Sequence, residues 1–240
     1  TTPLLDSVDH GTAVGTLAAL GKKLYPNHIG AFEADARLLS IKVLGGRNGN
    51  LPQSEVVRLI REAHARHGIK IFTLTITYMT PKKENSSISE YAYLLDLLAY
   101  ELDVLIFISI GNNNNLRVNG NPTGAVVTYP NHFESPDVNL FSTSESMNNI
   151  SIGAIAGNLE DNDNHCISPD GKHPAIYTRK FHINWNHSSI NQFRINKHLV
   201  KPDVGNFGGD YDANLDASIA GLKTVSTSTG IFFSKEVGTS

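Results

Sequence analysis

The sequence of 240 residues lacks three features that define common protein classes. It has no excess of positive charge: 20 Lys and Arg stand against 23 Asp and Glu, so it lacks the attraction to phosphate on which dedicated nucleic-acid-binding proteins depend. No apolar run approaches the ~20 residues that span a bilayer. The single cysteine, Cys166, excludes an internal disulfide and a multi-thiolate zinc site. We therefore predict no nucleic-acid partner and no membrane span.

What the sequence does contain is hydrophobic periodicity. A chain of this length can bury roughly 70% of the surface that it exposes when unfolded, which allows one large core. Strand-forming runs lie at residues 37–44, 69–77, 104–108 and 150–156, and helical stripes lie at 13–24, 53–67 and 89–102. This alternation predicts an α/β fold with three layers, in which a mostly parallel sheet carries helices on both faces.

Residues 157–198 lack this periodicity. They are rich in Asn, Asp, His and Ser, which predicts an irregular insertion or long loops. No shift in composition is sharp enough to mark a second domain, so we expect a single domain over residues 1–240. In such folds, functional sites lie at the carboxyl ends of the parallel strands.

A histidine opens the first expected helix, in the stretch from His10 to Gly15. The small residues of this stretch allow the helix to pack closely against its neighbours. An imidazole held rigidly at a helix N-terminus is suited to act as a general base. The alternative is an exposed histidine beside a helix cap.

The stretch Ser109-Ile110-Gly111-Asn112 directly follows the strand expected at 104–108. It puts the carboxamide of Asn112 at the carboxyl edge of the sheet, where a side-chain N–H can stabilise a developing oxyanion. The alternative is a Gly-Asn turn without a chemical role.

Two more short motifs lie near the end of the chain. One is Lys201-Pro202-Asp203-Val204, and the other is the final Gly238-Thr239-Ser240. A serine that begins a helix can expose its hydroxyl and direct its backbone N–H at a bound oxyanion. The alternative is a serine that serves only as a helix cap.

Taken in this order, the motifs resemble those of the subtilisin-like serine peptidases, the subtilase family. Residues Ile152-Gly153-Ala154 also match a strand that the family carries between the last two motifs. The resemblance covers nearly the whole chain. It implies a subtilisin-like fold and a serine endopeptidase that hydrolyses polypeptides through an acyl-enzyme intermediate. It also implies that His10 is the general base, Asn112 the oxyanion donor and Ser240 the nucleophile.

The aspartate that orients the histidine in this family is not identifiable here. The family places it in an Asp-Ser/Thr-Gly motif some tens of residues before the histidine, whereas only nine residues precede His10. Asp6 and Asp9 are better explained as loop or capping carboxylates. We expect the chain to be a fragment, with the aspartate upstream of Thr1 and the helix after Ser240 missing, and such a fragment to be inactive.

The resemblance assigns substrate binding to Thr75, Ile76, Thr77 and Gly111. The first three form the end of the strand expected at 69–77, which corresponds to the strand that pairs with substrate in the family. Thr77 stands where the family has a glycine that leaves space for a substrate side chain. A narrowed or altered specificity pocket is therefore expected.

Cofactor and compartment follow only from the resemblance. Calcium is a cofactor that many subtilases bind, but Glu160, Asp161 and Asp163 do not fit the spacing of an EF-hand loop and are typical of a polar surface loop. The resemblance also favours a secreted or cell-envelope protein, although the chain opens without a signal-peptide pattern.

Two other functions compete with the peptidase. The altered position Thr77 and the missing aspartate suit a catalytically dead member of the family that serves as a protein-binding scaffold. A nucleotide-binding domain would need a phosphate loop, and residues 45–49 lack the Gly-x-Gly-x-x-Gly and Gly-Lys-Ser/Thr patterns. The leading interpretation is a serine endopeptidase.

Overall fold

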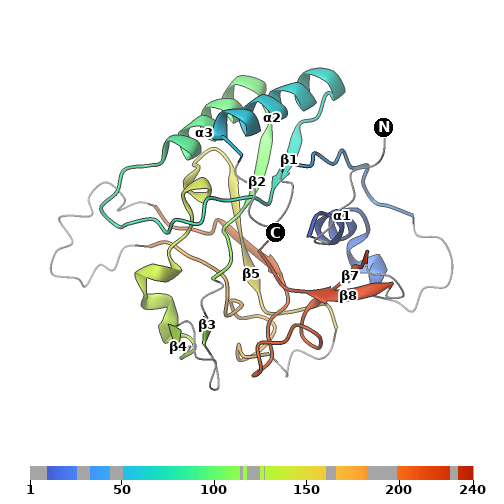
Figure 1. Cartoon of the computed structure of the whole chain (residues 1–240), viewed down its shortest axis with the longest axis vertical. Helices are drawn as coiled ribbons and strands as arrows, with labels where there is room; N and C mark the ends of the chain where they lie inside the picture. Colours follow the sequence, from blue (N-terminus) through green and yellow to red (C-terminus); the bar gives the residue numbers. More distant parts are fainter. Residues whose placement is uncertain are drawn as a thin grey trace.

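The structure, a computed structural model, describes residues 10–25, 33–43, 51–113, 116–117, 125–126, 128–160, 166–182, 199–227 and 232–239. Figure 1 shows how the helices and strands of these residues are arranged. In chain order they are α1 (His10–Leu20), η1 (Gly21–Leu24), α2 (Gln53–His67), β1 (Ile71–Leu74), α3 (Glu90–Leu102), β2 (Leu105–Ser109), β3 (Leu116–Arg117), β4 (Ala125–Val126), η2 (Asn131–Glu134), η3 (Pro136–Val138), η4 (Ser142–Glu145), β5 (Ile150–Ile155), β6 (Val204–Phe207), β7 (Leu222–Val225) and β8 (Phe233–Glu236).

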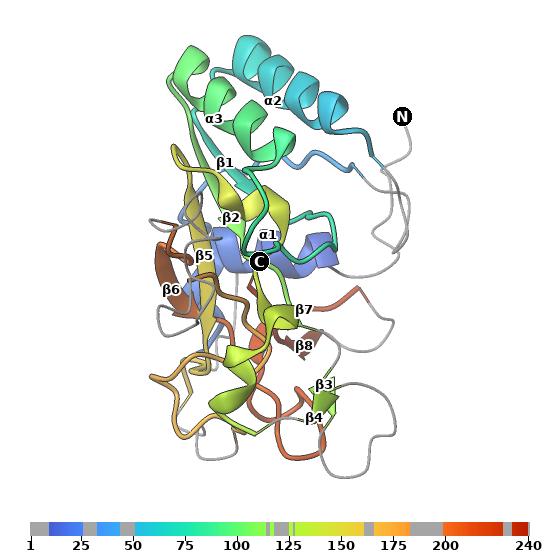
Figure 2. The ribbon, with the colours of Figure 1, turned by 90° about the vertical axis from the view of Figure 1, so that its left-hand side faces the viewer.

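Four parallel strands form the central sheet, in the order β1-β2-β5-β6. Leu74 of β1 is aligned with Ile108 of β2, and Ser109 of β2 is aligned with Ile152 of β5. On its other side, Ile152 is aligned with Val204 of β6. Parallel neighbours need a crossover connection, and α3 supplies the one between β1 and β2. The parallel sheet with its helices confirms the predicted α/β class (Figure 2).

Local sequence sets the ends of α2 and α3. Helix α2 starts directly after Pro52 and ends at Gly68, whose φ of 66° is a left-handed conformation that glycine adopts without strain. Ser89 caps α3, because its hydroxyl accepts a hydrogen bond from the Ala92 N–H at 3.2 Å. Both helices were predicted over nearly these ranges.

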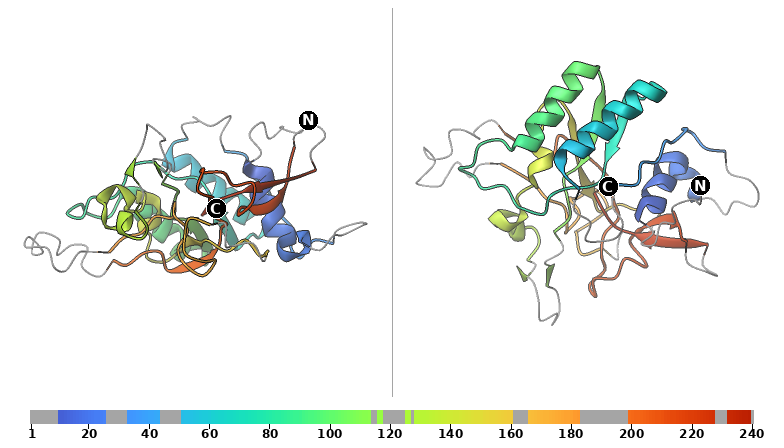
Figure 3. Two further views of the ribbon diagram at one scale, coloured as in Figure 1. Left: turned by 90° about the horizontal axis from the view of Figure 1, so that it is seen from below. Right: turned by 45° about the horizontal axis from the view of Figure 1, so that its top comes forward.

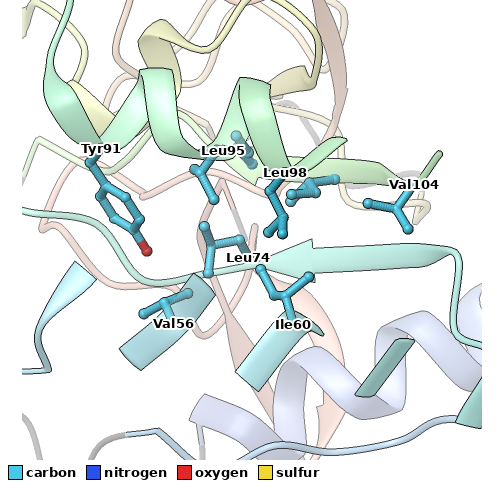
Figure 4. Packing of buried hydrophobic residues seen from close by; sticks show 9 residues of the cluster. Val56, Ile60, Leu74, Tyr91, Leu95, Leu98 and Val104 are labelled. Carbon is cyan, nitrogen blue, oxygen red and sulfur yellow. The ribbon is translucent and has the colours of Figure 1, made fainter. Parts of the chain in front are cut away.

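The main hydrophobic core lies between these two helices and the strands β1 and β2. Figure 4 shows Val56 and Ile60 of α2 below Leu74 of β1, with Leu95 and Leu98 of α3 above it. Full burial of one such side chain stabilises the fold by roughly 1.5–3 kcal/mol. The core therefore holds the carboxyl end of β2 firmly in place.

One hydroxyl in this core has no hydrogen-bond partner. Tyr91 is 1% exposed and its ring meets Tyr78 edge-on, but its hydroxyl is unsatisfied and burial raises its pKa. We expect Tyr91→Phe to raise the free energy of unfolding by about 1 kcal/mol, measured by urea denaturation, because it removes a buried polar atom without partner. The control is Tyr78→Phe, which removes a hydrogen bond of 2.6 Å to the Leu51 carbonyl and should destabilise. A loss of stability in Tyr91→Phe would contradict the assignment.

Two strand predictions need correction. Residues 37–43 form no strand, and Leu38 and Ile41 are 52% and 37% exposed. A β-rich sequence needs a partner strand, and none of the described strands pairs with these residues. The strand expected at 69–77 exists but covers only four residues at the sheet edge, where Ile71 is 66% exposed.

The carboxyl-terminal hairpin of β7 and β8 is a separate antiparallel sheet. Helix α1 packs against β7, and Figure 3 shows the blue helix beside the red hairpin. The Tyr25 hydroxyl, just after η1, accepts a hydrogen bond from the Lys223 N–H at 3.1 Å. A segment near the start of the described chain thus contacts a segment near its end. Among the described helices, none is long and apolar enough to cross a membrane.

Part of the segment predicted as irregular enters the core. Ala175, Ile176 and Tyr177 are buried against Ala154 and Ala156, at the end of β5 and just beyond it. These three residues lie outside any helix or strand element. The single domain with an insertion at 157–198 stays a prediction, because 161–165 and 183–198 lie outside the described residues.

Candidate active site

Polar residues from two distant segments meet at the carboxyl end of β2. Ser109 is the last residue of this strand, and Gly111 and Asn112 follow it. Thr239 follows β8 at the other end of the chain, 127 positions after Asn112. The three-dimensional fold therefore joins two of the motifs that the sequence analysis singled out.

Thr239 fixes the orientation of the Asn112 carboxamide. Asn112 Oδ1 accepts a hydrogen bond from the Thr239 backbone N–H at 3.1 Å and another from the Thr239 hydroxyl at 3.0 Å. A backbone N–H can only donate, so the amide atom that faces it must be the oxygen. The Nδ2 group therefore points away from Thr239, and within the described residues no partner accepts its protons.

The Thr239 hydroxyl is also a hydrogen-bond acceptor for residues of β2 and its end. Ser109 Oγ lies 2.6 Å from Thr239 Oγ1, and the Gly111 N–H donates to the same oxygen at 3.2 Å. The Gly111 N–H also approaches Ser109 Oγ at 3.3 Å. Ser109 and Thr239 are both buried, so these contacts are sheltered from water.

Gly111 cannot be replaced by a larger residue without strain. Its φ is 91°, a conformation that residues with a Cβ rarely adopt. A Cβ built at this position would lie 2.4 Å from the ring of Phe141. The turn after β2 therefore depends on glycine for both its conformation and its space.

Arg179 is a buried cation that binds the backbone of Asn112. Its Nε donates to the Asn112 carbonyl at 3.1 Å, and its Nη1 donates to the carbonyls of Asp137 and Asn139, both at 2.8 Å. The guanidinium also lies 3.8 Å from the centroid of the Phe141 ring. Burial lowers the pKa of Arg179 to about 10, which leaves it charged at neutral pH. Arg179 thus ties the turn after β2 to the segment around η3.

Tyr177 holds the segment that leads to Thr239. The Tyr177 hydroxyl lies 2.8 Å from the Gly208 carbonyl and 2.9 Å from the Gly209 carbonyl, and it accepts a hydrogen bond from the Gly238 N–H at 3.1 Å. Its own carbonyl accepts from the Asn113 N–H at 2.7 Å. Burial raises the pKa of Tyr177 well above its ordinary value, so the hydroxyl keeps its proton. Tyr177 therefore connects three segments of the site, two through its hydroxyl and one through its backbone carbonyl.

The motif around Asp203 lies directly before β6, which is the edge strand on the other side of the sheet from β1. Asp203 Oδ2 accepts hydrogen bonds from the Ser151 N–H and hydroxyl, each at 2.8 Å, and from Lys201 Nζ at 2.6 Å. Burial acts to raise the pKa of Asp203, but these donors outweigh it and the pKa is lowered. The motif joins β6 to β5 and lies away from Asn112.

The predicted substrate-binding residues leave the sheet next to this site. Leu74 is aligned with Ile108, so residues 75–77 and 110–112 follow neighbouring strands at the same carboxyl end of the sheet. Thr75, Ile76 and Thr77 are all half-buried, and Ile76 packs against the main core. Their role in binding stays a prediction.

The structure gives less detail on the other predicted catalytic residues. His10 is exposed and is the first residue of α1. Helix α1 packs against β7, and β7 pairs with β8, the strand that comes just before Gly238. Ser240, Asp6 and Asp9 lie outside the described residues. The structure thus brings Asn112 and Gly111 to Thr239, the neighbour of Ser240, and puts the helix of His10 on the adjoining hairpin.

Within the ranges that the structure describes, no group of three or more His, Cys, Asp or Glu side chains is arranged to hold a metal ion. Glu160 is instead paired with Lys235, and Asp161 and Asp163 lie outside the described residues.

Sequence reasoning missed Tyr177, Arg179 and Phe141. No motif marks them, because they lie far from the site residues in the sequence and come close to them only in the folded chain. The one available signal was the apolar run Ala175-Ile176-Tyr177 inside an otherwise polar stretch, which is typical of a buried segment.

Comparison with known proteins gives two findings. The model of the family described as "Subtilase family" matches residues 2–240. A solved structure described as that of the prenylagaramide maturation protease PagA is similar, with 12% sequence identity and a TM-score of 0.40. The match covers 82% of this chain and 47% of that protein, so the chain spans about half the length of that protein. No curated protein matches the sequence.

Proposed function

Because this chain belongs to the subtilase family, we propose that it carries the catalytic machinery of a serine endopeptidase that cleaves polypeptides. In this proposal Ser240 is the nucleophile, His10 is the general base and Asn112 donates a hydrogen bond to the oxyanion. Thr75, Ile76, Thr77 and Gly111 line the bound substrate.

The observation that carries the proposal is the pair of hydrogen bonds between Thr239 and Asn112. They fix the residue next to the proposed nucleophile against the proposed oxyanion donor. They also turn the Asn112 Nδ2 group away from Thr239, so that its protons are available to a substrate. An Asn used only as a turn residue would not need to contact the Gly-Thr-Ser segment.

The reaction follows from these assignments. His10 takes the proton from the Ser240 hydroxyl as its oxygen attacks the peptide carbonyl, and the carbonyl oxygen becomes an oxyanion. Asn112 Nδ2 and the Ser240 backbone N–H stabilise that charge. His10 then gives its proton to the leaving amine, and a water molecule hydrolyses the acyl-enzyme by the same steps. The carboxylate that orients His10 is not assigned.

A fluorophosphonate probe tests this function, because it reacts with activated serines. In the complete protein that the gene encodes, we expect the probe to label Ser240, as seen by mass spectrometry of the modified peptide. The Ser240→Ala and His10→Ala variants should lose labelling, while an exposed-histidine variant, His67→Ala, should keep it. Absence of label in the folded protein would refute the peptidase.

The alternative function is a catalytically inactive, protein-binding subtilase. The feature that favours it is Thr77, which stands at a position where the family has glycine and would restrict the room for a substrate side chain. A folded complete protein that reacts with no probe and cleaves no casein, yet binds an unfolded polypeptide such as reduced casein, would support this alternative.

A further inference from the structure

We propose that Ser109 is a positioning residue that sets the strength and orientation of the Asn112 oxyanion donor, acting through the Thr239 hydroxyl. The proposal rests on the peptidase function above. It concerns a residue that would not touch the substrate.

The number of protons on the three side chains determines the direction of each hydrogen bond. The Asn112 carboxamide oxygen can only accept, so the single proton of the Thr239 hydroxyl is used in the bond to Asn112 Oδ1. Thr239 Oγ1 must then accept at its contact with Ser109, and the Ser109 hydroxyl must be the donor there. The chain of donors thus runs from Ser109 to Thr239 to Asn112.

A chain of this kind strengthens each of its members. A hydroxyl that accepts a hydrogen bond becomes a better donor, and in a low-dielectric interior this polarisation passes along the chain. The polarised Asn112 carbonyl draws electron density from its own nitrogen. The Nδ2 protons, which have no partner among the described residues, then become better donors to an oxyanion.

Ser109 is held in a buried, hydrogen-bonded position. It is 5% exposed, and its carbonyl accepts a hydrogen bond from the Ser144 hydroxyl at 2.8 Å. It is also aligned with Ile152 in the middle of the sheet. Among the hydrogen-bond contacts of Thr239 Oγ1, the one to the Ser109 hydroxyl is the shortest, at 2.6 Å.

The test measures the rate at which a fluorophosphonate phosphonylates Ser240 in the complete protein, separated into the maximal rate and the binding constant of the probe. We expect Ser109→Ala to lower the maximal rate about 5- to 10-fold, as for the loss of one hydrogen bond, with the binding constant within about twofold. Ser109→Thr, which keeps a hydroxyl, should recover most of the rate. The matched control is Thr143→Val, which removes a buried hydroxyl without partner in η4 and should leave the rate unchanged.

A double-mutant cycle separates positioning from general damage. If Ser109 acts through Asn112, the variant with both Ser109→Ala and Asn112→Ala should be no slower than Asn112→Ala alone. Effects that multiply in the double variant would overturn the proposal, because they show a role independent of the carboxamide. A full rate in Ser109→Ala would also overturn it. The peptidase function fails separately, if the unmodified protein takes up no label.

Discussion

Asn112→Ala is expected to lower the turnover of fluorescein-labelled casein by the complete protein about 10²- to 10³-fold. The reason is that, in the proposed function, the Nδ2 group donates to charge that exists only in the transition state, so its loss slows the chemical step. Substrate binding should change little, and the apparent KM should stay within about threefold. The measurement is the initial rate of casein cleavage over a range of substrate concentrations.

Two further variants separate the donor from the fold. Asn112→Asp keeps an oxygen facing the Thr239 N–H and hydroxyl but has no Nδ2 donor, so turnover should fall at least as far as in Asn112→Ala. Asn206→Ala removes the same kind of side chain from an exposed position in β6 and should retain full turnover. An Asn112→Asp variant with near-normal turnover would disprove the oxyanion role.

Lys82→Met is expected to lower the free energy of unfolding by about 3–5 kcal/mol, the cost of leaving a buried charge without its partner. The Lys82 and Glu145 side chains are 0% and 3% exposed, and Lys82 Nζ lies 2.6 Å from Glu145 Oε2. The same carboxylate oxygen accepts from the N–H of Ser89, the cap of α3, at 3.2 Å. Urea denaturation followed by circular dichroism gives the change in stability.

The loss of stability in Lys82→Met should depend on pH. Burial raises the pKa of Glu145 even with Lys82 beside it, and without Lys82 the pKa should rise further. A carboxyl whose folded pKa is raised binds its proton more tightly when folded, so stability falls as pH rises from the ordinary pKa through the folded one. The difference between Lys82→Met and the unmodified protein should therefore be larger at pH 8 than at pH 5.

Two controls accompany the Lys82 variant. Adding Glu145→Gln removes the unpaired charge and should recover part of the lost stability at pH 8. Lys70→Met breaks the exposed pair with Asp103 and should cost less than about 1 kcal/mol. If Lys70→Met and Lys82→Met lowered the free energy of unfolding by the same small amount, the buried pair would contribute no more to stability than the exposed one.

The sequence predicted those parts of the fold whose signals are local. Pro52 and Gly68 bound α2, and Ser89 begins α3, because caps and left-handed glycines act within one turn of a helix. The strand at 37–44 was predicted by the same kind of reasoning and is absent from residues 37–43. A helix satisfies its hydrogen bonds internally, whereas a strand depends on a neighbour that local sequence does not name.

The sequence by itself determined the α/β class, the limits of the main helices, and the order of motifs that led to the subtilase family. Only the tertiary structure decided that Asn112 meets Thr239, that Tyr177 and Arg179 hold these segments, and that the Ser109 hydroxyl contacts the Thr239 hydroxyl. The physical reason is the distance along the sequence over which each kind of signal acts. Periodicity and caps act between residues a few positions apart, while a hydrogen bond across 127 positions forms only once the sheet and its core have brought the partners within 3.1 Å.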